Sequence, residues 1–159
     1  MYAVLVRVLG IDYGRRRIGL ALSDATGLLA RPWKTLAREG NPSQVAVALG
    51  AEIAALRAEA DGLGAVVMGL PRRLNGDEHE LSRAVRLLAN QLRLAVEVPV
   101  HLQDERLSSR EAEARLALRE KDWRKRKSAL DAASAAVILQ DYLDASERTL
   151  TVHQPGEQA

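Results

Sequence analysis

Residues 10–24 read GIDYGRRRIGLALSD, and this stretch decides how the chain begins to fold. Apolar residues on both faces of residues 3–13 predict a central strand that is buried on both sides. Gly14 opens a turn through three arginines, and a second apolar run follows over residues 18–23. Because such a short connection joins neighbouring strands of opposite direction, we expect an antiparallel pair.

The rest of the chain predicts an α/β domain on a five-stranded mixed sheet, with three antiparallel strands, then two parallel ones, and helices on both faces. The expected strands cover residues 3–13, 18–23, 28–35, 65–70 and 98–103. The expected helices cover residues 42–60, 78–94, 108–119 and 129–145.

The C-terminal third is expected to contain one exposed loop and a tail. Residues 120–127 include a single apolar residue, Trp123, which favours a loop, and Ser128 is expected to cap the last helix. The sequence therefore predicts one domain over residues 1–145 and a flexible tail over residues 146–159.

The composition limits the kinds of site that the chain can form. Its 159 residues fit one domain, and Cys is absent, which excludes disulfides and thiolate metal sites. With three His residues, a metal would be held mainly by carboxylates, which suit Mg²⁺ or Mn²⁺. No signal peptide or membrane-spanning run is apparent, so we expect a cytoplasmic protein that does not bind membranes.

Asp12 and Asp131 are acids in positions that otherwise read as buried. Asp12 extends one face of the first strand, although it could instead accept N–H groups of the glycine turn. Asp131 shares a helical stripe with Ala135 and Ile138, although an acid near a helix start also favours the helix dipole. An unpaired carboxylate on a buried face is costly, and metal coordination would remove that cost.

Asp104 and Glu105 end the last expected strand, where alternation points them to opposite faces. At least one of them can therefore face Asp12, although either could merely charge the turn before the next helix. As a set, Asp12, Asp131 and one of these two acids predict a site for Mg²⁺ or Mn²⁺. Two such ions can activate a water molecule and stabilise the leaving oxygen in phosphodiester hydrolysis.

Basic residues gather next to these acids, although the formal net charge of +2 does not by itself indicate a polyanionic partner. Solvated loops are the alternative reading of each cluster, and Trp123 could either stack on a base or anchor its loop. The candidate nucleic-acid-binding residues are Arg15, Arg16, Arg17, Arg72, Arg73, Trp123, Arg124, Lys125, Arg126 and Lys127.

Four segments in this order resemble the YqgF family of Holliday junction resolvases. The resemblance covers roughly residues 9–143, and no single segment is decisive without the others. The segments are GIDYGRRRIGLALSD at 10–24, VVMGLPRRLNGDEHE at 66–80, DERLSSREA at 104–112 and LDAASAAVIL at 130–139.

The resemblance implies a ribonuclease H-like fold and a nuclease that acts on four-way DNA junctions or on the 5′ end of precursor 16S ribosomal RNA. It implies that Asp12, Glu105 and Asp131 are catalytic and bind metal. It favours Glu105 as the direct ligand and leaves Asp104 as an alternate ligand. The triple arginine at 15–17 departs from the family pattern, which bears on substrate preference. A homodimer is compatible with the sequence.

Two alternatives from other classes remain. An actin-like or sugar-kinase-type nucleotide-binding domain also begins with an Asp strand and a glycine hairpin, but that architecture needs two such domains and a longer chain. A non-catalytic ribosome-assembly factor could keep the acids for structure. Metal-dependent cleavage and ATP affinity distinguish these alternatives from a nuclease.

Overall fold

The computed structural model describes residues 6–71, 80–105 and 123–152, and for residues 105, 123–128 and 147–152 it describes the backbone alone. The strands are β1 (Arg7–Tyr13), β2 (Arg17–Ser23), β3 (Ala30–Ala37), β4 (Leu63–Pro71) and β5 (Val100–Glu105). The helices are α1 (Pro42–Ala58), α2 (Glu80–Ala95) and α4 (Trp123–Val152).

The strands form one sheet in the order β3-β2-β1-β4-β5. β2 pairs antiparallel with both β1 and β3, whereas β4 is parallel to β1 and β5 is parallel to β4. The predicted five-stranded mixed sheet is therefore confirmed, and β1 is the central strand.

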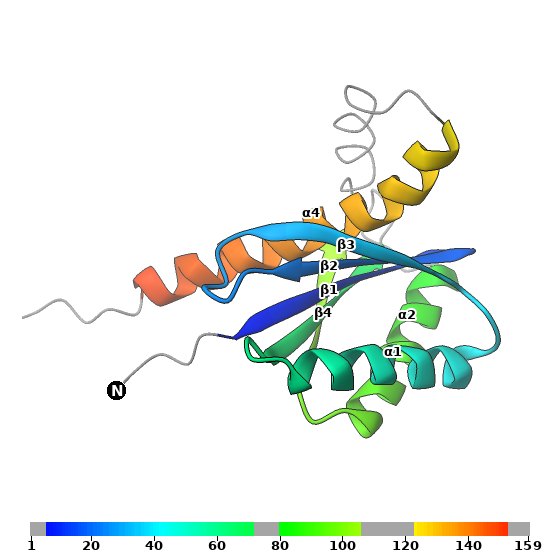
Figure 1. Ribbon diagram of the computed structural model, residues 1–159, viewed down its shortest axis with the longest axis horizontal. Coiled ribbons are helices and arrows are strands. Elements are labelled where there is room, and N and C mark those ends of the chain that lie inside the picture. Colours follow the sequence, from blue (N-terminus) through cyan, green and yellow to red (C-terminus); the bar gives the residue numbers. More distant parts are fainter. Residues whose placement is uncertain (1–5, 72–79, 106–122, 153–159) are drawn as a thin grey trace, which may run out of the picture.

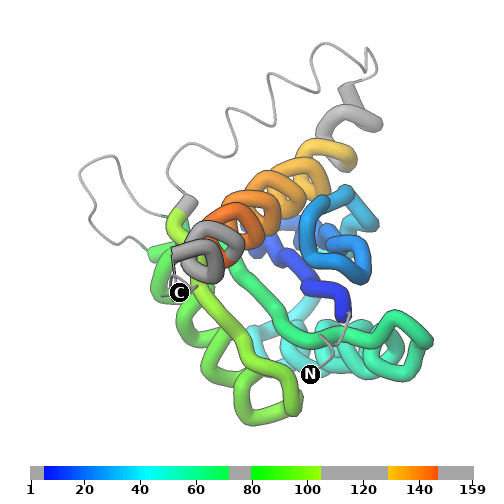
Figure 2. Tube along the Cα trace, turned by 90° about the vertical axis from the view of Figure 1, so that its left-hand side faces the viewer, coloured from blue at the N-terminus to red at the C-terminus, as the bar shows by residue number. Residues whose placement is uncertain are grey.

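Helices cover both faces of this sheet, with α4 on one face and α1 and α2 on the other (Figure 1, Figure 2). Leu9, Ile11 and Tyr13 of β1 belong to the larger hydrophobic cluster, which also contains the buried apolar residues of α1 and α2. The alternate residues of β1, Gly10 and Asp12, are on the α4 face. Each side chain of β1 therefore packs against α4 or against α1 and α2, depending on the face of the sheet on which it lies.

Glycines allow α4 to lie directly on the sheet. A Cβ atom on Gly19 would lie 1.9 Å from the backbone oxygen of Asp131, and one on Gly10 would lie 2.8 Å from Cβ of Leu139. Ordinary side chains at these two positions would hold the helix away from β1 and β2. The absence of Cβ atoms therefore sets how closely α4 approaches the sheet.

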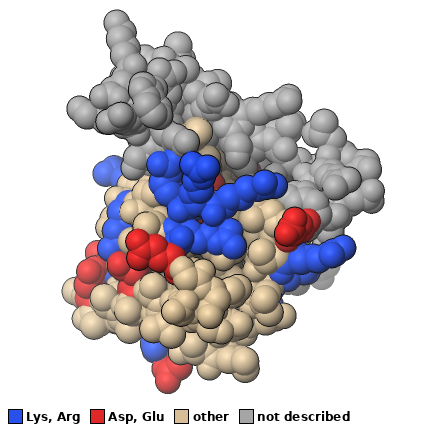
Figure 3. All heavy atoms as spheres, turned by 90° about the vertical axis from the view of Figure 1, so that its right-hand side faces the viewer, with Lys and Arg blue, Asp and Glu red and all other residues tan. Residues whose placement is uncertain are grey.

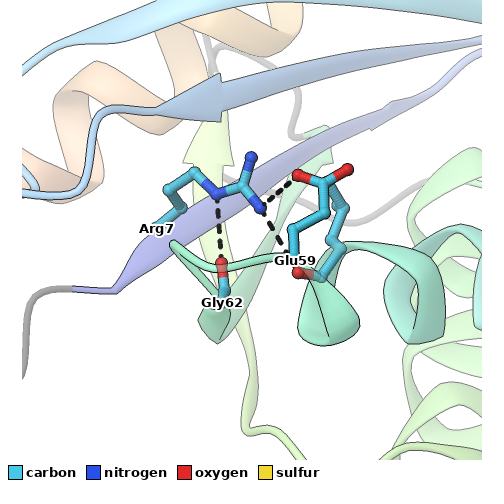
Figure 4. Close-up of polar contacts among 4 residues, drawn as sticks. Arg7, Glu59 and Gly62 are labelled. Carbon is cyan, nitrogen blue, oxygen red and sulfur yellow. Dashed lines mark hydrogen bonds and ion pairs between the residues drawn. The ribbon is translucent and has the colours of Figure 1, made fainter.

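Arg7, the first residue of β1, bonds to the segment that follows α1 (Figure 4). Its Nε donates to the carbonyl oxygen of Gly62 at 3.1 Å, and its Nη2 donates to Glu59 Oε2 at 2.7 Å and to the Leu56 oxygen at 3.3 Å. The bond to Leu56 reaches a carbonyl group in the last turn of α1, and the bond to Gly62 reaches one in the segment between α1 and β4. They place the start of β4 beside the start of β1, as the parallel pairing requires.

The last helix is longer than the sequence predicts. The predicted loop is wrong for Trp123–Lys127, because α4 begins at Trp123, and Ser128 lies inside the helix instead of capping it. Lys and Arg favour helices and no Gly or Pro interrupts the run, so this polar segment is a helix rather than a loop. The predicted helix at 108–119 lies outside the described residues.

α4 also continues past the predicted end at Ala145 to Val152, so the first part of the predicted tail is helical. Residues 153–159 lie outside the described part of the chain, and the division at residue 145 stays a prediction. Although α4 has 30 residues, no helix within the described ranges is long and apolar enough to cross a membrane.

We predict that Gly19→Ala destabilises the protein by about 3 kcal/mol or more, because the new methyl group overlaps the backbone of α4. Gly50→Ala is the matched control: Gly50 lies in α1 with nothing within 4 Å of an added Cβ atom. Its replacement should stabilise the helix by about 0.5–1 kcal/mol. Urea denaturation of both variants measures the difference, and equal effects would contradict the proposed contact.

Candidate active site

Asp12 and Asp131, which the sequence predicts as partners, lie next to each other in the structure. Asp12 of β1 is directly opposite Gly19 of β2 in the antiparallel ladder. The backbone of Asp131 packs against that same glycine. Opposed residues in such a pair have Cα atoms roughly 5 Å apart, so the contact brings a helix residue beside a strand residue far away in the sequence.

Alternative explanations of these two acids do not fit the structure. α4 begins at Trp123 and has no acid in its first turn, so Asp131 is not a charge that favours the start of a helix. The N–H of Gly14 donates to the carbonyl oxygen of Arg17 at 3.0 Å rather than to Asp12. The glycine turn therefore does not explain Asp12, and the helix dipole does not explain Asp131.

The two acids disfavour each other's negative charge. Burial raises the pKa of Asp12 from 3.8 to about 7, and the negative charge of Asp131 acts in the same direction. Asp131 is partly neutralised by Arg17, whose Nε donates to Oδ2 at 2.9 Å. The site is thus short of positive charge, which is the electrostatic condition that a bound cation would relieve.

The alternation of β5 distinguishes the positions of Asp104 and Glu105. His101 of β5 stacks on Tyr142 of α4 with ring centroids 5.5 Å apart, so alternate residues counted from His101 are on the α4 face. Asp104 has the opposite parity, that of Val100 in the larger cluster, and is exposed. Glu105 has the parity of His101, and its backbone pairs with Pro71.

Three of the four predicted metal ligands have described side chains. Asp12 and Asp131 are adjacent and Asp104 is exposed, whereas the side chain of Glu105 lies outside the described part of the structure. Among the side chains that are described, no group of three or more His, Asp or Glu residues could hold a metal ion. The metal site therefore stays a prediction.

Basic residues surround the end of the molecule at which β1 ends. Figure 3 shows Lys and Arg side chains gathered in one area of that side. Arg15 and Arg16 are exposed in the turn after β1, while Arg17 is partly buried against Asp131. The other candidates cannot be placed: Arg72 and Arg73 lie outside the described residues, and for Trp123, Arg124, Lys125, Arg126 and Lys127 only the helical backbone is described.

Arg38, which the sequence analysis missed, belongs to the same region. Its guanidinium lies 4.1 Å from the ring centroid of Tyr13, and its Nη1 donates to the carbonyl oxygen of Gly14 at 3.0 Å. With Arg15 and the first turn of α2 it lines a hollow of about 190 Å³. Arg38 is not part of a run of basic residues, so the sequence does not single it out. The pairing of β3 with β2 predicts that Arg38 lies near the arginine turn.

We predict that Asp12 makes the stability of the cation-free protein depend on pH. The folded chain keeps this proton up to about pH 7, whereas the unfolded chain loses it near 3.8. The resulting stabilisation is complete below the unfolded pKa and is lost as the pH rises through the folded one. Between these limits, wild type should lose up to about 4 kcal/mol relative to Asp12→Asn.

Urea denaturation in a chelator at several pH values, for wild type and Asp12→Asn, measures this difference. Asp24→Asn is a useful contrast, because hydrogen bonds from Thr26 and from the backbone lower the pKa of the exposed Asp24. A constant stability difference between wild type and Asp12→Asn across this range would contradict the raised pKa.

The chain is similar to known proteins over most of its length. The family model RuvX, described as Holliday junction resolvase, matches residues 6–145. A protein of Anaeromyxobacter dehalogenans, named as a candidate pre-16S rRNA nuclease, is 43% identical over 139 residues, which are 87% of this chain and 97% of that protein. A protein of Maridesulfovibrio salexigens with the same name is 39% identical over 138 residues, with coverages of 87% and 98%.

A solved structure shares the fold. RuvC of T. thermophilus, in complex with a Holliday junction substrate, superposes with a TM-score of 0.52 at 19% identity, covering 91% of this chain and 97% of that one. This likeness confirms the ribonuclease H-like fold that the resemblance implied. On the match of its family model and the identity to these relatives, the chain belongs to the RuvX family, also called YqgF.

Proposed function

We propose that this protein is a metal-dependent nuclease that hydrolyses phosphodiester bonds in structured nucleic acid. The observation that carries the proposal is the meeting of Asp12 and Asp131 against Gly19. Two carboxylates brought together from a strand and a helix, in a site short of positive charge, form an arrangement suited to divalent cations. Membership of the RuvX family supports the same conclusion.

The residues present fit Mg²⁺ or Mn²⁺. Carboxylate oxygens are the ligands these ions prefer, and binding a cation offsets both the burial of Asp12 and its repulsion from Asp131. Asp12, Asp131 and Glu105 would hold the metal, and the parity of β5 supports Glu105 over Asp104 as the third ligand. Two such ions, when bound, activate a water molecule and stabilise the leaving oxygen.

The protein's own groups prepare this site and hold the substrate. Asp12 binds a cation only after losing its proton, so metal affinity should rise as the pH approaches 7. Gly19 fixes the spacing of Asp12 and Asp131. We propose that Arg15, Arg16 and Arg38 contact the nucleic-acid strand, because Arg15 and Arg16 are exposed, Arg38 lines a hollow with Arg15, and arginines hold phosphates without reading bases.

The substrate class follows from the relatives and the basic surface. The family model is described as a Holliday junction resolvase, and the relatives are named as candidate pre-16S rRNA nucleases. We propose that this chain acts on a four-way DNA junction or on precursor 16S rRNA, both of which are structured polyanions. The family match favours this function over a kinase-like ATPase or a non-catalytic assembly factor. Cytoplasmic location and homodimer formation stay predictions.

We predict that Asp12→Asn, Asp131→Asn and Glu105→Gln each reduce cleavage by about 100-fold or more, because each removes a group that positions the stabilising charge. Asp104→Asn should keep activity within about threefold, because Asp104 is exposed and substitutions at exposed positions usually have small effects. Asp61→Asn, at an exposed acid near the opposite end of the sheet, is the matched control. The assay compares a four-way DNA junction, single-stranded DNA and precursor 16S rRNA with Mg²⁺, with Mn²⁺ and with a chelator.

Cleavage by Asp12→Asn at the wild-type rate would reject the mechanism. Loss of activity in Asp104→Asn but not in Glu105→Gln would exchange the roles of these two acids. Tight ATP binding without cleavage of any nucleic acid would favour the nucleotide-binding alternative.

We predict that Arg38→Gln weakens substrate binding about threefold to tenfold at low salt, because it removes one phosphate contact. The slope of log affinity against log salt concentration should fall by about 0.9. Arg31→Gln is the matched control, because Arg31 is an exposed arginine at the other end of β3. Fluorescence anisotropy in a chelator measures both variants, and equal losses for the two would remove Arg38 from the binding surface.

A further inference from the structure

Arg17 differs from its two neighbours in the arginine turn. Arg15 and Arg16 are exposed, whereas the side chain of Arg17 is 32% exposed and is bonded to Asp131, which is 25% exposed. The Nε–Oδ2 distance is 2.9 Å. A residue expected from the sequence to hold nucleic acid is thus engaged with a predicted metal ligand.

The backbone around Arg17 fixes where its side chain begins. Its carbonyl oxygen accepts from the N–H of Gly14 at 3.0 Å, and a Cβ atom on Gly14 would lie 2.7 Å from that oxygen. Arg17 is also the first residue of β2 and pairs with Ala37 of β3. The turn and the ladder hold the main chain, whereas the long arginine side chain can change its rotamer and so its partner.

The charges at the site favour such a change. Asp12 and Asp131 together carry two negative charges when ionised, and Arg17 supplies one positive charge, on Asp131. A divalent cation bound to both acids neutralises them by itself and repels the guanidinium. The cation and the guanidinium therefore compete for the same carboxylate, and a displaced guanidinium is available to an anion.

We propose that Arg17 is an exchangeable counter-ion, whose guanidinium holds Asp131 while the site lacks a divalent cation and moves to a phosphate of the nucleic-acid strand when the cation binds. This inference rests on the proposed function and adds a link between the two ligands: cation binding prepares a phosphate contact. Arg17 then acts on cation affinity by competition and on substrate affinity by contact.

The first measurement is Mn²⁺ binding by calorimetry, without nucleic acid. Arg17→Gln should bind Mn²⁺ about fivefold more tightly than wild type, the effect expected from removing a partly exposed ion pair. Arg16→Gln removes the same charge from a neighbouring exposed position and should change the affinity less than about twofold. Arg17→Lys keeps a charge without the planar guanidinium and should lie between wild type and Arg17→Gln.

The second measurement compares the affinity for a four-way DNA junction in two buffers, one with a chelator and one with Ca²⁺. Ca²⁺ is the probe cation because it binds oxygen ligands such as carboxylates. In the chelator Arg17→Gln should bind like wild type, since Arg17 is then engaged with Asp131. In Ca²⁺ it should bind about fivefold more weakly. Arg16→Gln should bind more weakly than wild type in both buffers, and a denaturing gel checks that the junction stays intact.

Arg17→Gln with no tighter Mn²⁺ binding than Arg16→Gln would overturn the inference, as would an equal loss of junction affinity in both buffers. Thermal unfolding confirms that the variants are folded, and Arg17→Lys provides the comparison if Arg17→Gln is not. Failure of wild type to bind Mn²⁺ would instead reject the metal site of the proposed function, so the two failures are distinguishable.

Discussion

The contact of α4 with β1 and β2 at Gly10 and Gly19 is the constraint on which the site depends. Atoms of α4 occupy the space where side chains at these two strand positions would lie: the backbone of Asp131 at Gly19, and the Leu139 side chain with the Ala135 oxygen at Gly10. Leu139 therefore packs on Gly10, and Asp131 comes to lie beside Asp12. A helix held further out by ordinary side chains would leave the two acids apart, with the same sheet and the same strand order.

This contact brings together groups that oppose folding when no cation is bound. Two carboxylates near each other in a partly buried place are unfavourable, as the raised pKa of Asp12 shows. The packing of Ala135, Leu139 and Leu143 in the cluster beneath α4 offsets that cost, and Arg17 neutralises part of the charge. Apolar contacts elsewhere on α4 therefore keep Asp131 beside Asp12, although the two carboxylates repel each other.

The end of β1 separates two kinds of chemistry onto the two faces of the sheet. Asp12 is on the α4 face with the other acid, whereas Tyr13, the next residue, is on the opposite face with Arg38 above its ring. Strand alternation alone creates this division. A negative centre bordered by arginines is the pattern expected of a protein that holds a phosphate chain against bound cations, which agrees with membership of the RuvX family.

The sequence by itself determined the strands and their succession along the chain, the position of Asp12 at the end of a buried strand and the helical face of Asp131. Strand alternation and helical periodicity are local properties, so a single sequence contains them. It failed at Trp123–Lys127, since a run of polar residues does not distinguish a loop from a helix. Only the tertiary structure decided that Arg17 bonds to Asp131 and that Arg38 lies over Tyr13. Arg17 and Asp131 are far apart in the chain, and their meeting depends on how closely Gly10 and Gly19 let α4 approach the sheet. Arg38 reaches Tyr13 through the pairing of β3 with β2.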